Sequence, residues 1–388
     1  MQLSYLKVKN FRSIESLELG EFGQVTTFFG PNNTGKSNIL SAIRFGVYGT
    51  TEPHPTPYFT SLSSNRQQLF DIYQNDTSLD VEVTLELGLE LDDTLRMLEV
   101  LEVERPQDFN KGFSEDDLAK AKTLRISRSL RMDEHGSQMT IEELSLGSKN
   151  VLGASYTSGR GEVKSVVDLL KFMVEGCLHE ISAFRKFSHE TDRPAFRSMP
   201  SSWISGEDMK KALFNLSHSE DGEDRKNFAE IHSAFSSPPF SYGSFSVVRS
   251  QEGSNDLRIM VDRESFEVPI EYLGSGPQQV LMVLTNVLRR KGHIVAIEEP
   301  ECNLSPESQR EFSKKLIEYT TQQESPIGQL LISTHSTVFG FQGTRFMVSH
   351  DGEKTIVKEV KSEEDEKEAL DHFAPTWKDY RPLSSGNR

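Results

Sequence analysis

Residues Gly30 to Ser37 read Gly-Pro-Asn-Asn-Thr-Gly-Lys-Ser, with the types and spacing of a loop that binds phosphate groups. Glycines let the backbone curl so that its N–H groups point at phosphate oxygens. Lys36 would reach the β and γ phosphates of a nucleoside triphosphate, and the hydroxyl of Ser37 would bind Mg²⁺. The residues expected to contact the nucleotide are Gly30, Pro31, Asn32, Asn33, Thr34, Gly35, Lys36, Ser37 and Asn38.

The residues on either side of this loop supply the context that the motif requires. Residues 24–29 are β-branched and aromatic, which predicts a strand. Residues 38–45 have apolar side chains at helical spacing, and the positive end of such a helix would face the phosphates. An ordinary glycine turn is the alternative, and the strand–loop–helix order favours the phosphate site.

Two adjacent acids follow an apolar run far downstream. Residues 293–297 predict a buried parallel strand, and Glu298 and Glu299 come directly after it. A phosphate loop needs one acid to hold Mg²⁺ through water and one to orient and deprotonate the attacking water. We assign Glu298 to the metal and Glu299 to the base, the alternative being a solvent-exposed acidic turn.

A Ser-Gly turn and a histidine complete the candidate residues. Ser275 and Gly276 open the apolar helix expected over residues 280–288, where free N–H groups and a hydroxyl could face a phosphate. His335 follows the strand expected over residues 329–332 and could contact a γ phosphate or position water. A purely structural histidine is the alternative.

Composition limits the class of protein. The chain has 388 residues, a net charge of −16 and two cysteines, Cys177 and Cys302, which we expect to be packing residues. Because it contains no long apolar run and no signal-peptide core, we expect a soluble cytoplasmic protein that does not enter a membrane. The negative charge argues against a generic nucleic-acid coating protein. We interpret the short basic runs as solvated helix faces, which leaves DNA binding open; they are Lys210-Lys211, Arg225-Lys226 and Arg289-Arg290-Lys291.

The remaining pattern divides the chain coarsely. Alternating runs predict an antiparallel layer, residues 162–235 predict helices of an inserted arm, a hairpin precedes Ser275, and residues 52–66 predict a mobile loop. The strands expected in the layer are residues 81–87, 123–127 and 140–144, and those of the hairpin are 257–261 and 266–270. The expected units are a first lobe 1–150, a mainly helical insertion 151–256, a second lobe 257–360 and an acidic polar tail 361–388.

In this order, the motifs resemble those of the ATP-binding-cassette (ABC) class of ATPases, in the branch that contains SMC proteins, RecF and the OLD family. Gly30 to Ser37 match Walker A, residues 273–279 the signature, residues 294–299 Walker B, residues 303–306 the D-loop, and His335 the switch histidine. The resemblance implies an α/β ABC-type ATPase head, with a mixed sheet, an antiparallel β layer and an inserted helical arm.

The resemblance also assigns further residues. Ser275, Gly276 and Gln278 would act in trans on a nucleotide held by another subunit. Arg12, in an opening strand similar to that of this branch, would approach the nucleotide, although a surface arginine fits equally well. Gln74 is our choice for the Q-loop glutamine at the metal; its rivals are Gln67 and Gln68.

Two departures favour the OLD-like branch: the signature reads Gly-Ser-Gly-Pro-Gln, and Glu298 stands where most members have Asp. We expect neither a long coiled coil nor a nuclease domain. The resemblance implies a homodimer or higher homo-oligomer that sandwiches ATP and Mg²⁺, hydrolyses ATP to ADP and phosphate, and controls a separate nuclease or toxin in bacterial antiphage defence. The alternatives are a RecF- or SMC-like DNA-binding ATPase of DNA repair and a slow-hydrolysing sensor scaffold.

Overall fold

The structure is a computed structural model of the 388-residue chain. It describes residues 1–49, 62–64, 72–90, 93–95, 99, 102, 109–110, 114–133, 136–174, 176–181, 206–249, 257–288, 293–322, 325–340 and 342–373. Most of the loop expected over residues 52–66, the rival glutamines Gln67 and Gln68, the basic run Arg289-Arg290-Lys291 and residues 374–388 lie outside the described residues.

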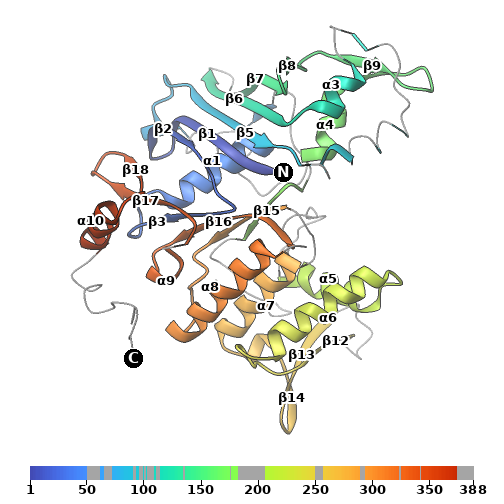
Figure 1. Cartoon of the computed structure of the whole chain (residues 1–388), viewed down its shortest axis with the longest axis vertical. Helices are drawn as coiled ribbons and strands as arrows, with labels where there is room; N and C mark the ends of the chain where they lie inside the picture. The colour runs from blue at the N-terminus through green and yellow to red at the C-terminus, as the bar shows by residue number, and fades with distance from the viewer. Residues whose placement is uncertain are drawn as a thin grey trace.

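A six-stranded sheet forms the centre of the molecule (Figure 1). In sheet order its strands are β11 (Leu178–Ile181), β15 (His293–Glu298), β16 (Ile327–Thr334), β3 (Val25–Phe29), β17 (Thr344–His350) and β18 (Thr355–Glu359). The pairs from β11 to β17 are parallel, and β18 is antiparallel to β17. Because both faces of the sheet are covered, its inner strands are almost continuously buried.

A second, antiparallel sheet forms an outer layer. Its order is β2 (Ile14–Gly20), β1 (Gln2–Phe11), β5 (Val81–Gly88), β6 (Thr123–Asp133), β7 (Gly136–Leu146) and β4 (Leu62–Ser64), and β8 (Lys149–Asn150) pairs with β7. Buried and more exposed residues alternate along β5, as a sheet with one solvated face requires. The three strands expected here from the sequence are therefore confirmed, and each is longer than expected.

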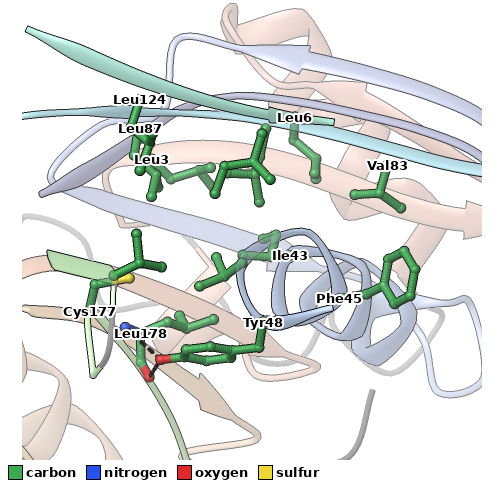
Figure 2. Packing of buried hydrophobic residues seen from close by; sticks show 14 of the residues in the cluster. Leu3, Leu6, Ile43, Phe45, Tyr48, Val83, Leu87, Leu124, Cys177 and Leu178 are labelled. Atoms are coloured by element: carbon green, nitrogen blue, oxygen red, sulfur yellow. Dashed lines mark hydrogen bonds between the residues drawn. The ribbon is translucent and has the colours of Figure 1, made fainter. Parts of the chain in front are cut away.

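Helix α1 (Lys36–Tyr48) lies between the two sheets (Figure 2). Its buried side chains, among them Ile43 and Phe45, pack against the inner face of the antiparallel sheet in one continuous core. Tyr48 fixes the far end of the helix, because its hydroxyl donates to the carbonyl oxygen of Leu178 at 2.9 Å. Packing on both sides holds the helix that follows the phosphate loop in one place.

The opposite face of the central sheet is covered by α7 (Ser275–Leu288), α8 (Pro306–Thr321) and α9 (Thr337–Gly340). Alternation along the strands separates the two faces: Val295 and Ile297 of β15 join the core under α7, whereas Ile294 and Ala296 join the core that contains α1. The sheet therefore separates α1 from α7.

The expected insertion combines helices with short strands, and it shares a sheet with residues 257–269, which were assigned to the second lobe. Helices α5 (Gly206–His218) and α6 (Gly222–Ser236) pack beside a three-stranded sheet of β12 (Phe245–Arg249), β13 (Leu257–Arg263) and β14 (Phe266–Pro269). The remaining elements are η2 (Tyr73–Asn75), α3 (Glu115–Lys120), β9 (Ser155–Thr157), β10 (Val163–Ser165), α4 (Val166–Val174), η3 (Ile270–Tyr272) and α10 (Glu363–Phe373).

Besides the short strand β10, two elements differ from the expected pattern. Residues 162–235 were predicted to be helical, but β11 lies among α4, α5 and α6 and joins the central sheet at its edge. The segment predicted as a polar tail contains α10, whose Ala369 is buried against Phe29 and Met347. Both elements are stabilised by partners distant in sequence, which a local pattern does not reveal. No helix within the described ranges is long and apolar enough to cross a membrane.

Candidate active site

The candidate residues gather at one edge of the central sheet. The loop Gly30 to Ser37 follows β3, Glu298 and Glu299 stand at the end of β15, and His335 follows β16, which lies between those two strands. Parallel strands end at the same edge of a sheet, which is where ligands bind in such folds. The topology thus brings together three motifs that are far apart in sequence.

The phosphate loop is shaped by two glycines. A Cβ on Gly30 would overlap the carbonyl oxygen of Val348 in β17. Gly35 has a φ of 101° and faces the hydroxyl of Thr355 at the start of β18. The loop therefore needs glycine at both positions, in one case for space and in the other for space and conformation.

A chain of hydroxyl contacts holds the loop from behind. Asn38 donates to the hydroxyl of Ser13 at 2.7 Å, and that hydroxyl lies 2.7 Å from the hydroxyl of Thr355. Thr355 in turn donates to the carbonyl oxygen of Thr34 at 2.9 Å. Ser13 and Thr355 were not found from the sequence, because neither belongs to a recognisable motif and Thr355 lies 321 residues from Thr34.

Lys36 is buried inside its own loop. Its Nζ donates to the carbonyl oxygens of Gly30 at 2.9 Å and Pro31 at 2.7 Å. Burial lowers the pKa of Lys36, and the negative charges of Glu299 and Glu301 act in the opposite direction. The outer loop residues Pro31, Asn32, Asn33 and Ser37 remain exposed.

Arg12 lies in the turn between β1 and β2 and contacts the first turns of α1. Its Nη1 donates to the hydroxyl of Ser41 at 3.0 Å and lies 3.4 Å from Oδ1 of Asn38. The structure therefore places Arg12 beside the phosphate-loop helix rather than on a remote surface.

Gln74 lies in η2, with an exposed side chain and a φ of 52°. Ile72, two residues before it, forms a bridge with Phe11 at the end of β1. The Nε2 of Gln74 donates to the hydroxyl of Tyr73 at 3.0 Å. This contact is local and joins Gln74 to neither proposed metal ligand, so its Q-loop role stays a prediction.

Glu298 and Glu299 diverge where β15 ends. Glu298 is in register with Ser333 of β16, whereas Glu299 adopts a φ of 44°, which turns the chain sharply. The N–H of Glu299 donates to the carbonyl oxygen of Ser333 at 2.7 Å, and the thiol of Cys302 donates to Oε2 of Glu299 at 3.2 Å. Cys302, expected to be a packing residue, instead touches the candidate base.

The donor set fits Mg²⁺ bound with a nucleotide. Ser37 has an exposed hydroxyl and Glu298 a half-buried carboxylate, which are the oxygen ligands that this ion prefers. The described residues contain no cluster of three or more His, Cys, Asp or Glu side chains able to hold a metal. A site of this kind relies on substrate phosphates and water for the remaining ligands.

His335 is half-exposed and faces two acids. Its Nδ1 lies 3.1 Å from Oε1 of Glu301 and 3.8 Å from Oε1 of Glu299. Glu301 was not among the predicted site residues, although it belongs to the same Glu-Glu-Pro-Glu run. Its place as the third acid of this run was the only hint in the sequence. Its burial follows from the tertiary fold.

The signature residues lie at the start of α7. Ser275 is exposed; Gly276 is buried, and a Cβ there would press on the carbonyl oxygen of Asn303. Gln278 donates to the carbonyl oxygen of Leu273 at 2.9 Å. Because α7 and α1 lie on opposite faces of the central sheet, one chain presents its signature and its phosphate loop on different sides.

Lys210 corrects one sequence expectation. It was expected on a solvated helix face, but it is buried and forms a 2.7 Å ion pair with Glu271, just before the signature. The pair links α5 of the insertion to the turn that leads into α7. Arg225, in contrast, is exposed, as expected for a solvated helix face. Its Nη1 donates to the carbonyl oxygen of Ser219, in the loop before α6, at 2.9 Å.

This arrangement is that of an ABC-type ATPase head. The fold resembles an Smc head bound to the C-winged helix domain of ScpA, with a TM-score of 0.53 and 14% identity over 95% of this chain and 100% of that one. It also resembles an Smc head with an extended coiled coil, bound to the C-terminal domain of ScpA derived from Pyrococcus furiosus, with a TM-score of 0.51 and 14% identity over 94% and 98% of the two chains. The expected fold class is thus confirmed.

Residues 1–157 and 182–339 match the AAA ATPase domain family AAA_15, and the chain belongs to this family. It is 25% identical to the OLD nuclease of Thermus scotoductus over 401 residues, which cover 97% of this chain and 67% of that protein. It is 40% identical to the RecF protein of Lactococcus lactis over 68 residues, 18% of either chain. These similarities confirm the predicted SMC, RecF and OLD branch of ATPases.

Proposed function

We propose that the chain binds ATP with Mg²⁺ and hydrolyses it to ADP and phosphate in a site that a second copy completes. The observation that carries this proposal is the convergence of Lys36, Glu299 and His335 at one sheet edge, with His335 3.8 Å from Glu299. Burial lowers the pKa of Lys36 and the negative charge of Glu299 acts to raise it, which supports placing both residues in one site.

Each residue has a distinct task in the proposed reaction. Lys36 would leave the carbonyl oxygens of its loop and bind the β and γ phosphates, while Ser37 and Glu298 would hold Mg²⁺. When bound, the ion neutralises charge on the transferred phosphate oxygens. Glu299 would accept the proton of the attacking water, and His335 would contact the γ phosphate. Arg12 would approach the nucleotide from the β1–β2 turn.

The separation of α1 and α7 by the central sheet supports a nucleotide sandwich. Ser275, Gly276 and Gln278 of one copy would close over ATP held by the loop of another, in a homodimer or higher oligomer. ATP would then act as a ligand for association and hydrolysis as the release step.

The effector is a further part of the proposal. The alignment with the OLD nuclease leaves a third of that protein without a counterpart in these 388 residues. We propose that a separate nuclease or toxin chain responds to nucleotide-dependent association, in a bacterial antiphage defence system. This part rests on family analogy, whereas the ATPase part rests on the site.

Ion pairing on the outer sheet weighs against the DNA-repair alternative. Lys9 pairs with Glu82 at 2.9 Å, Arg131 with Asp80 at 2.9 Å, and Arg125 lies 3.4 Å from Glu143. A cation that is already paired with an acid neutralises phosphates less effectively, so fewer counterions would leave the nucleic acid on binding. The slow-scaffold alternative predicts an assembly whose mass is indifferent to ATP.

The test is the mass of the Glu299→Gln protein by light scattering, with and without ATP and Mg²⁺, at physiological salt. We expect ATP to increase the subunit number, because binding without hydrolysis holds the sandwich closed. The matched control carries Lys36→Ala as well and should not respond. A mass above monomer that ATP leaves unchanged would instead support the scaffold. Normal ATP turnover by Glu299→Gln would remove Glu299 from the proposed mechanism.

A further inference from the structure

Glu301 is a buried acid that the proposed reaction does not use. It is 4% exposed and lies in the turn between β15 and α8, two residues after Glu299. Its Oε1 accepts from the hydroxyl of Thr334 at 2.6 Å and from the N–H groups of His335 at 2.8 Å and Ser336 at 3.1 Å. The imidazole Nδ1 of His335 lies 3.1 Å from the same oxygen.

All four contacts come from Thr334, the last residue of β16, and from the turn that follows it. The second oxygen of Glu301, Oε2, is buried and has no hydrogen-bond partner among the described residues. A buried carboxylate is costly unless donors surround it. The donors here are concentrated on one oxygen and on three consecutive residues, so Glu301 ties the turn that bears Glu299 to the turn that bears His335.

The backbone of the His335 turn has other support. The N–H of Ser336 also donates to the hydroxyl of Thr334 at 2.9 Å, and the hydroxyl of Ser336 donates to Oε1 of Gln309 at 2.9 Å. The N–H of Val338 bonds the hydroxyl of Ser336 at 3.2 Å. These contacts can hold the backbone of the turn by themselves, whereas Glu301 places a carboxylate oxygen 3.1 Å from the imidazole Nδ1.

We infer that Glu301 is a positioning residue that fixes the ring of His335. A carboxylate oxygen 3.1 Å from Nδ1 favours a hydrogen on that nitrogen, and a neutral ring in that tautomer would present Nε2 as its acceptor. Glu301 thereby sets which edge of His335 faces the nucleotide and keeps the ring next to Glu299. This inference rests on the proposed function only for its effect on hydrolysis.

The first test needs no nucleotide. Long-range ¹⁵N–¹H correlation spectra of the imidazoles, with His335→Ala to assign the signal, should show the hydrogen of His335 on Nδ1. Glu301→Met removes the acceptor at similar size, and the signal should change toward mixed tautomers. Glu301→Gln keeps an acceptor oxygen and should retain the wild-type signal. Gln309→Met is the matched control, because it releases Ser336 without touching the ring.

The second test is a double-mutant cycle on ATP hydrolysis. We expect Glu301→Met to lower kcat by about tenfold or more with an unchanged KM for ATP. In the His335→Ala background, the same substitution should add no further loss, because Glu301 acts through that ring.

The outcomes separate the two ideas. An unchanged His335 signal in Glu301→Met, or an equal additional loss of kcat without His335, would overturn the positioning role. A wild-type protein that does not hydrolyse ATP would instead contradict the proposed function, while the spectra would still decide the role of Glu301. If Glu301→Met does not fold, the wild-type spectrum decides: a hydrogen of His335 on Nε2 instead of Nδ1 would contradict the inference.

Discussion

The ammonium group of Lys36 donates to the carbonyl oxygen of Pro31 at 2.7 Å, so the phosphate loop closes around its own lysine. The same group also donates to the carbonyl oxygen of Gly30 at 2.9 Å. A triphosphate would exchange these neutral acceptors for charged ones, which make stronger hydrogen bonds with an ammonium group. The loop is therefore preformed around the charge that the ligand needs.

Replacing Lys36 with Ala should abolish measurable ATP binding in calorimetry, because the buried cation is the only side-chain charge that the loop itself contributes. Lys354→Ala is the control: Lys354 lies in the nearby β17–β18 turn, is half-exposed and pairs with Glu15 of β2. It should bind ATP like the wild type. An unchanged affinity of the Lys36→Ala protein would remove the phosphate-loop assignment.

Gly35→Ala should weaken nucleotide binding and lower the free energy of unfolding by about 1 to 3 kcal/mol. A side chain at a φ of 101° is strained, and its Cβ would also overlap the hydroxyl of Thr355. Adding Thr355→Ala should relieve the overlap but not the strain, so urea denaturation should show partial recovery when the double variant is compared with Thr355→Ala alone, which lacks the bond to Thr34. Full recovery would mean that space alone requires this glycine.

Arg128→Met should destabilise the fold by about 1 to 3 kcal/mol in urea denaturation. Arg128 is fully buried, and its guanidinium donates to the carbonyl oxygens of Gly46 at 2.8 Å and Val47 at 3.1 Å, which end α1. Arg131→Met, in the same strand, removes an exposed ion pair with Asp80 and should cost less than about 1 kcal/mol. Equal effects would show that capping α1 is unimportant.

The two cysteines should differ in reactivity toward a thiol reagent such as DTNB. Burial raises the pKa of Cys177 to about 12, so at pH 8 almost none of it is the reactive thiolate. Cys302 is half-exposed and should react. Native protein should therefore release one equivalent and unfolded protein both, since Cys177 reacts only when unfolding removes its burial. Cys302→Ser is the control and should leave the native protein unreactive.

Much of the site could be predicted because the residues of each motif are adjacent in the sequence. The loop at residues 30–37 binds phosphate with backbone N–H groups of neighbouring residues, and its strand and helix appear in the structure as β3 and α1. The acids that end β15 and the histidine that follows β16 could likewise be read from apolar runs and their polar ends. The roles assigned to these residues stay predictions.

Other parts could not be predicted, because they depend on partners far along the chain. The four residues of β11 have no repeating pattern long enough to indicate a strand, and pairing with β15 decides their structure. The sequence around Lys210 suggests a surface cation, but in the fold Lys210 is buried and pairs with Glu271. A short segment has too few local interactions to fix its own conformation, so tertiary contacts decide it.

The sequence by itself determined the phosphate loop, the paired acids and the class of ATPase. Each of these depends on motifs of adjacent residues, whose arrangement follows from local backbone geometry. Only the tertiary structure decided that Thr355 holds the loop from behind, that Glu301 faces His335, and that α1 and α7 lie on opposite sides of one sheet. These relations join residues through strand order and burial, and such contacts exist only after the chain has folded.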